Sequence, residues 1–295
     1  MSRLFTALAA AALVASPLAA QDRPVETDST WRYSTRLAAG AWVRVFTFNG
    51  DVEVREGTGD QVEVRAEKRG RRTRWDRIYF EHRKTGNDVT VCAIYGNDAD
   101  CDDDGIHGNQ NSSNVGTRFT VTVPRGAKVR VGSGNGEVMV RAAVAEAHVG
   151  TGNGEVTVAG IRGPVNASTG NGELTVSDVE GRVEASTGNG RVTINTAMGP
   201  VNVRTGNGSI DVRMARLAGE GDMEFHTGNG RVSVALPASF EGEIESNTGS
   251  GHLESDFAMQ VSGRMDRRHM RATIGRGGRK VKMSSGNGDL ELRKI

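Results

Sequence analysis

The sequence predicts an all-β protein, in which a parallel β-solenoid of about 18 residues per coil follows an N-terminal β cap. The first observation is a Ser/Thr-Gly-Asn-Gly motif that returns at a fixed spacing. The second is the alternation of apolar and polar residues on both sides of each motif, which is typical of β-strands. The third is composition, because 40 glycines and 5% aromatic residues suit a thin core of small aliphatic side chains.

The first 20 residues have the pattern of a secretory signal peptide. Arg3 gives a basic start, Leu4–Ala15 is an apolar run, and the small residues Ala19 and Ala20 precede Gln21. The run has about a dozen residues, whereas a helix that crosses a bilayer needs about 20. We therefore expect an exported chain that loses residues 1–20 and has no transmembrane span in the remainder. A membrane anchor that is never cleaved is the alternative.

Residues 21–130 form a less regular β segment. Val43–Phe46, Val52–Val54 and Phe119–Val123 alternate as strands do, and all three tryptophans of the chain lie in its first third. A solenoid needs a terminal unit that covers its first apolar layer and its open strand edge. We expect this segment to be that cap, with an independent binding domain as the alternative. The solenoid itself is expected at residues 131–295.

Cys92 and Cys101 are the only cysteines and lie within the expected cap. In an exported chain, such a pair predicts a disulfide rather than a metal or redox site. Asp100-x-Asp102-x-Asp104-Gly105 matches the opening of a calcium loop, but the twelfth position is Asn111 and not Glu. We therefore expect a solvated loop and no metal, with a calcium site at Asp100, Asp102 and Asp104 as the alternative.

The repeats occupy the rest of the chain. The first glycines of five successive motifs are 18 residues apart, and the later motifs follow after 22, 21 and 37 residues. A strict period with later insertions indicates stacked units with loops on one side. Glycine permits a tight corner between two strands, and the asparagines could hydrogen-bond from one corner to the next. The predicted corner residues are Gly134, Asn135, Gly136, Gly152, Asn153, Gly154, Gly170, Asn171, Gly172, Gly188, Asn189, Gly190, Gly206, Asn207 and Gly208.

Columns of equivalent residues support parallel stacking. Steps of 18 residues stay apolar in four columns, which begin at Ala147, Val156, Val158 and Ile161, and the last of these runs through Val179 and Ala197 to Ala215. A slip of one residue would turn the strand residues outward, so the register is well specified. Asn-Gly is also a strong hairpin signal, which leaves an antiparallel meander or sandwich as the alternative fold. We favour the solenoid, because a meander does not need units that are nearly identical.

No catalytic signature is present in the sequence. It contains neither a Gly-x-Ser-x-Gly elbow nor a His-Glu-x-x-His zinc motif. Stacked Glu155 and Glu173 would place two carboxylates about 5 Å apart, as in a retaining glycosidase, but Arg191 continues their column. We expect no enzyme and no cofactor. The net charge of +1 gives no reason to expect nucleic acid as a partner.

The chain resembles the bacterial "putative adhesin" domain family, a group of unknown function thought to form β-solenoids. The motifs that carry the resemblance are Asn49–Val54, the serial Gly-Asn-Gly units, Ile274–Gly278 and Ser284–Leu290. It covers roughly residues 41–295 and brings no catalytic residues. The resemblance implies a non-enzymatic envelope or surface protein, in the periplasm, on the outer membrane or outside the cell, that presents a rigid rod to glycans or envelope proteins. A polysaccharide-acting enzyme and a periplasmic sensor or assembly factor are the alternatives.

Overall fold

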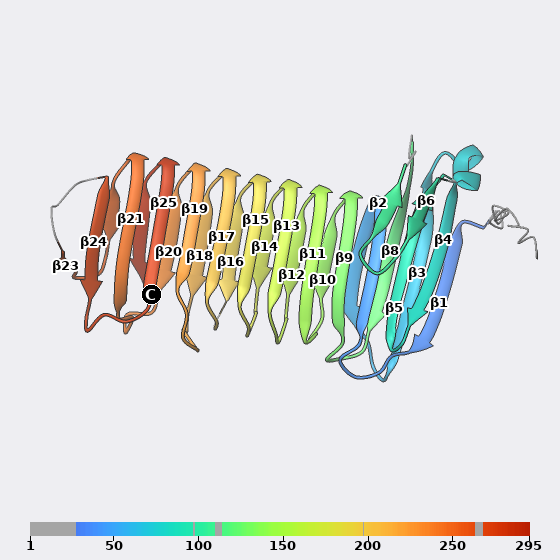
Figure 1. The fold of residues 1–295 in the computed structure, drawn as a ribbon, viewed down its shortest axis with the longest axis horizontal. Coiled ribbons are helices and arrows are strands. Elements are labelled where there is room, and N and C mark those ends of the chain that lie inside the picture. The colour runs from blue at the N-terminus through green and yellow to red at the C-terminus, as the bar shows by residue number, and fades with distance from the viewer. Residues whose placement is uncertain (1–27, 97, 110–113, 197, 263–267) are drawn as a thin grey trace, which may run out of the picture.

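The computed structural model describes residues 28–96, 98–109, 114–196, 198–262 and 268–295. These residues form a long rod of stacked strands (Figure 1), in which 24 strands make one continuous hydrogen-bonded sheet folded into two faces. We name the faces A and B. The expected signal peptide at residues 1–20 lies outside the described residues. In the described part of the chain, no helix is long and apolar enough to cross a membrane.

Each regular coil contributes one strand to each face. Face B receives β9 (Lys128–Asn135), β11 (Glu146–Asn153), β13 (Val165–Asn171), β15 (Val183–Asn189), β17 (Val201–Asn207) and β19 (Met223–Asn229). Face A receives β10 (Val138–Arg141), β12 (Val156–Ala159), β14 (Leu174–Ser177), β16 (Val192–Thr196), β18 (Ile210–Met214) and β20 (Val232–Leu236). Neighbouring coils pair in parallel within both faces. The parallel solenoid is thus confirmed, and the antiparallel meander is excluded.

The predicted columns fill the space between the two faces. Three of them are in register and buried throughout; they consist of Ala147, Val165, Val183 and Val201, of Val156, Leu174, Val192 and Ile210, and of Val158, Val176, Ile194 and Val212. In the fourth column, Ile161 and Val179 are buried and Ala197 lies outside the described residues. The prediction for Ala215 was wrong, since this residue is exposed. The chain leaves the 18-residue period there and enters a longer connection.

The Thr-Gly-Asn-Gly corners hold successive coils together through side chains. The amide nitrogen of Asn171 donates to the side-chain oxygen of Asn153, 2.8 Å away, and Asn189 donates to Asn171 in the same way. This ladder extends from Asn135 to Asn287 and ends on Ser250. The corner hydroxyl points inward, and Thr169 Oγ1 donates to the carbonyl of Gly154 in the preceding coil, 3.0 Å away. Each buried hydroxyl therefore finds an acceptor, as burial requires.

Parallel stacking begins earlier in the chain than the expected boundary at residue 130. Strand β2 (Trp42–Glu56) runs through both faces and pairs in parallel with β9 and β10 on one side. On its other side it pairs with β5 (Asp88–Tyr95) and β8 (Val115–Val123). The antiparallel cap strands are β1 (Thr30–Arg36), β3 (Gln61–Gly70) and β4 (Ile78–Thr85); the short helix η1 (Arg72–Arg77) and the hairpin of β6 (Ala99–Cys101) and β7 (Ile106–Gly108) complete this end.

Aromatic side chains close this end of the core. Trp31 of β1, at the edge of face A, stacks on Phe80 of β4, at the edge of face B, with 5.6 Å between ring centroids. Tyr33 also belongs to β1, and its ring lies 4.3 Å from the ring of His82 on β4. These contacts bridge the last strand of each face. The aromatic residues therefore cover the first apolar layer, as the sequence predicts.

The C-terminal end departs from sequential stacking. Strand β25 (Lys280–Asn287) lies between β19 and β21 (Gly242–Ser250), parallel to both (Figure 1). In face A, β26 (Leu290–Lys294) likewise lies between β20 and β22 (Leu253–Ser255). The terminal coil, β25 and β26, is thus inserted between the coil of β19 and β20 and the coil of β21 and β22, although it follows both in the chain. Strand β24 (His269–Ile274) then closes face B antiparallel to β21, with β23 (Gln260–Val261) beside it.

Glu224 on β19 links the inserted coil to the rest of the rod. Its carboxylate accepts a hydrogen bond from Arg204 of β17 at 2.9 Å and lies 3.4 Å from Lys282 of β25. The hydrogen bond from Arg204 and the nearby Lys282 lower the pKa of Glu224. A lowered folded-state pKa gives stability above the unfolded pKa of about 4.3, and that stability is lost as the pH falls through the folded value.

We therefore expect Glu224→Gln to lower the Tm at neutral pH, and the difference from the wild type to shrink as the pH falls from about 5 to about 3. Differential scanning calorimetry across this range checks the result. Glu184→Gln, on an exposed residue of the same outward column, is the matched control and should show a smaller difference at neutral pH. A Glu224→Gln effect that stays constant across the range would show that the ion pairs contribute nothing.

Candidate functional site

The outward positions of the middle coils form an open polar surface. Glu155 and Glu173, the carboxylates considered for glycosidase chemistry, are exposed and follow corners of adjacent coils. Thr157 Oγ1 lies 3.3 Å from a carboxylate oxygen of Glu155, which is an ordinary contact along one strand. This surface has the regular spacing of the coils and suits contacts that repeat along the rod.

The outer surface of face B carries a different feature at its N-terminal end, around Trp42. This residue begins β2, where Val43 and Val45 point into the core, so that its indole lies on the outside, half-buried. The ring centroid lies 5.4 Å from Lys128 Nζ and 5.2 Å from the ring of His148. The Arg44 guanidinium lies 5.7 Å from the same centroid. Three coils thus contribute to one aromatic and polar cluster, which we call the Trp42 cluster.

Carboxylates balance the cations of the Trp42 cluster. Glu146 lies 3.1 Å from Lys128 Nζ and 3.0 Å from His148 Nε2. Asp88 accepts a hydrogen bond from Arg44 at 2.9 Å and another from the backbone N–H of Trp42. The cluster therefore combines an indole with two cations, Lys128 and Arg44, each of which is paired with a carboxylate. An indole can pack against an apolar surface while neighbouring polar groups hydrogen-bond to the same ligand.

A disulfide fixes the β6–β7 hairpin beside this cluster. Cys92 on β5 is joined to Cys101 on β6, with 6.2 Å between their Cα atoms. Phe46, Ile94 and Ala99 pack with the two cysteines into a small second core, and Ile106 lies partly buried against it. Phe46, Cys92 and Ile94 alternate with core residues along β2 and β5, so the hairpin covers outward apolar side chains that would otherwise meet water.

The acidic residues considered for calcium bind other groups of the protein. Asp102 accepts hydrogen bonds from the backbone N–H groups of Asp104 and Gly105 and contacts His107. The bonds from Asp104 and His107 lower the pKa of Asp102. Asp104 pairs with Arg130 at 3.0 Å, while Asp100 is exposed on β6 opposite His107. Within the described ranges, no three His, Cys, Asp or Glu side chains are gathered as metal ligands would be.

We expect Cys92→Ala/Cys101→Ala to destabilise the protein by about 2–3 kcal/mol, because the short cross-linked loop loses its constraint in the unfolded chain. The hairpin should also open locally and expose Phe46 and Ile94. Urea unfolding measures the first effect, and amide hydrogen exchange in residues 98–109 measures the second. Asp104→Ala is the control, since it removes only the pair with Arg130 and should change stability by less than about 1 kcal/mol.

Two sets of residues were missed by sequence reasoning. The first set is the corner hydroxyls: a Ser or Thr precedes every Gly-Asn-Gly triplet, and this regularity signals a hydrogen bond that all corners share. The Trp42 cluster was also missed. Trp42 and Arg44 alternate with the inward residues Val43 and Val45, which indicates that both point outward. Lys128 and His148 belong to other coils, and only the pairing of the strands brings them beside Trp42.

Comparison with known proteins gives a family match and distant structural likenesses. The model of the family described as "Toastrack DUF4097" matches residues 45–293. No curated protein matches the chain. A structure described as a "putative adhesin" from Bacteroides fragilis is 10% identical and covers 90% of this chain and 97% of its own, with a TM-score of 0.44. A "putative adhesin" from Parabacteroides distasonis is 13% identical and covers 89% of this chain and 96% of its own, with a TM-score of 0.42.

A structure described as a "putative cell adhesion protein" from Clostridium sporogenes is 11% identical and covers 90% of this chain and 100% of its own, with a TM-score of 0.31. The family match is the decisive comparison, because it extends from the first coil of the rod almost to the last residue. The chain belongs to the Toastrack DUF4097 family, a domain family of unknown function.

Proposed function

We propose that this protein is a non-enzymatic component of the cell envelope or cell surface, which acts as an adhesin or scaffold by presenting face B of a rigid β-rod to glycans or envelope proteins. The observation that carries the proposal is the Trp42 cluster at one end of a long in-register face. Parallel coils fix the spacing between outward side chains, so that a polymeric ligand could contact several coils at once.

An extracytoplasmic location is part of the same proposal. The N-terminal pattern is that of a signal peptide. A disulfide also fixes the β6–β7 hairpin over an apolar patch of the cap. Disulfides persist in oxidising compartments, which include the periplasm and the outside of the cell. Fractionation of cells that produce the full chain, followed by thiol labelling with and without reductant, tests the location. A reduced protein in the cytoplasm would contradict it.

Binding is tested on arrays of bacterial and host glycans with the purified mature chain. We expect retention without cleavage, and we expect Trp42→Ala to weaken it about tenfold, since burial of an aromatic ring commonly contributes more than 1.4 kcal/mol. Thr175→Ala, a half-buried outward residue in the middle of the rod, is the control and should leave retention within about twofold. Equal retention by the Trp42→Ala variant would remove the proposed site.

A polysaccharide-acting enzyme is the second candidate, because Glu155 and Glu173 are neighbouring exposed carboxylates on face A. The same glycans, analysed for new reducing ends, distinguish the two functions. Cleavage that disappears in Glu155→Gln or Glu173→Gln would establish the enzyme. A periplasmic sensor or assembly factor would instead retain envelope proteins from a cross-linked extract and no glycan.

A further inference from the structure

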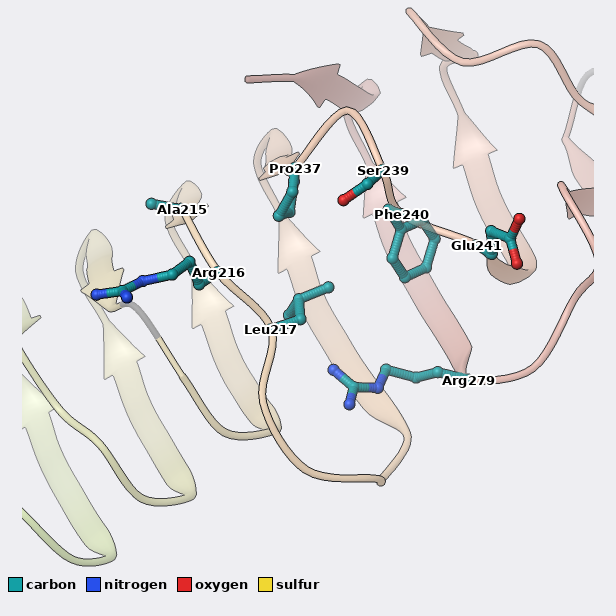
Figure 2. Close-up of a pocket in the computed structure, with 8 residues that line it drawn as sticks. All are labelled: Ala215, Arg216, Leu217, Pro237, Ser239, Phe240, Glu241 and Arg279. Atoms are coloured by element: carbon teal, nitrogen blue, oxygen red, sulfur yellow. The ribbon is translucent and has the colours of Figure 1, made fainter.

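A pocket of about 480 Å³ lies where the chain departs from sequential stacking. Three connections border it: the one between β18 and β19, the one between β20 and β21, and the one between β24 and β25. The first of these contains the extra residues that lengthen the repeat spacing from 18 to 22. Figure 2 shows that this connection passes in front of the neighbouring coils and brings Leu217 opposite Pro237 and Phe240.

One wall of the pocket is apolar and partly buried. Phe240 is 6% exposed, and Leu217 packs against the main core while remaining partly accessible. Pro237 lies above Leu217 and to the left of Phe240 in Figure 2. The pocket has the volume of a small-molecule site, which commonly spans roughly 300–1,000 Å³ and combines apolar walls with a few polar groups.

Arg279, at the start of the inserted coil, is one of the polar groups that line this pocket. Its Nη2 donates a hydrogen bond to the carbonyl oxygen of Gly219 and so holds the guanidinium against the long connection. Its Nη1 is buried and has no hydrogen-bond acceptor among the described residues. A buried donor on a charged group is costly when it has no acceptor. Arg279 as a whole is half-buried and lines the pocket, so its positive charge acts on a ligand there.

The carboxylate that lines the pocket pairs with a different arginine. Glu241 lines the pocket but pairs with Arg276 at 3.0 Å, and Figure 2 shows its carboxylate turned away from Phe240. Arg216 adds a further positive charge at the exposed rim. The pocket therefore joins an apolar wall to a guanidinium that is not paired with Glu241.

We propose that this pocket binds a small carboxylate that carries an apolar group. The carboxylate pairs with the positive charge of the Arg279 guanidinium, and the apolar group packs against Leu217, Pro237 and Phe240. Arginine favours carboxylates because its hydrogen bonds to them are charge-assisted. This site is separate from the Trp42 cluster and does not depend on the proposed adhesive function.

Hexanoate is the probe, with hexan-1-ol as its uncharged counterpart, and binding is followed by shifts of the backbone amide signals of Gly219 and Leu217. We expect saturable shifts with hexanoate and none with hexan-1-ol at equal concentration. Arg279→Met keeps an apolar stem and should weaken hexanoate binding by at least about tenfold. Arg182→Met removes an exposed arginine of the middle coils, outside the pocket lining, and should change the affinity less than about twofold.

Because Arg279 also holds the Gly219 connection, a second variant tests the pocket from its opposite wall. Leu217→Trp fills the apolar side, leaves the guanidinium in place, and should abolish the shifts. The proposal is overturned if hexanoate produces no saturable shift in the wild type. Binding that survives both Arg279→Met and Leu217→Trp, or that hexan-1-ol matches, overturns it equally.

Discussion

Removal of Lys280–Ile295 is expected to unfold the C-terminal end of the rod from β21 onward while the coils before it remain folded, since β19 and β20 still pair with β17 and β18. The inserted coil pairs with a strand on each side in both faces, so its loss separates β21 and β22 from the rest of the solenoid. Val281, Met283, Leu290 and Leu292 are completely buried. At about 1.5–3 kcal/mol for each buried side chain, the lost burial amounts to several kcal/mol before any hydrogen bond is counted.

Hydrogen exchange by mass spectrometry measures this result, and we expect protection to be lost in β21 and β24 but retained in β13 and β15. A synthetic peptide of residues 278–295 should restore protection by refilling the gap. Deletion of Gly163–Glu180 is the matched control. It removes one whole coil between equivalent corners, so that flanking columns meet in register, and it should leave a folded, slightly shorter rod.

Direct stacking of β21 on β19 in the truncated protein would contradict this prediction, since the two corners also match in sequence. Full protection of β21 without the peptide would reveal that outcome. If the variant that lacks Gly163–Glu180 does not fold, the coils on either side of the deletion cannot stack on each other as proposed.

A second large effect on stability is expected from Gly172→Ala, which should destabilise the protein by more than about 3 kcal/mol. Gly172 has a φ of +153°, which L-residues rarely adopt. A Cβ atom there would also lie 1.9 Å from the carbonyl oxygen of Gly154 in the adjacent coil. That oxygen belongs to the backbone and accepts the hydrogen bond of Thr169, so it cannot move aside without breaking the contact between coils.

Two further alanine variants separate the causes. Gly160 has a φ of +76° with open space around its Cβ position, so Gly160→Ala carries only backbone strain, on the order of 1 kcal/mol. Gly170→Ala places its Cβ 2.5 Å from the Gly152 oxygen without the positive φ, and should be intermediate. Chemical denaturation of the three variants gives the order. If Gly160→Ala costs as much as Gly172→Ala, close approach between coils is not what requires glycine.

Much of the fold could be predicted because each repeat shows the same pattern of apolar and polar positions. Val165 and Leu174 are each one member of a column, and agreement within a column fixed both the strand phase and the register. The pairing of Cys92 with Cys101 could be predicted because no other cysteine competes. The aromatic cap followed from the need to cover an open end of the core.

The Trp42 cluster and the pocket at Arg279 could not be predicted in the same way. Each joins residues from coils that are distant in sequence, such as Trp42 with Lys128 and Leu217 with Arg279. Their positions depend on which coil lies beside which, and no local pattern specifies that.

The sequence by itself determined the two-residue alternation, the 18-residue period and the glycine corners, since these follow from strand geometry and from the space that one backbone leaves for the next. Only the tertiary structure decided the order of the coils at both ends, where β2 lies between β8 and β10, and β25 lies between β19 and β21. The reason is that similar coils present similar apolar columns and corners, so many stacking orders bury the same side chains. The lengths of the connections and the packing of the two caps select one order among them.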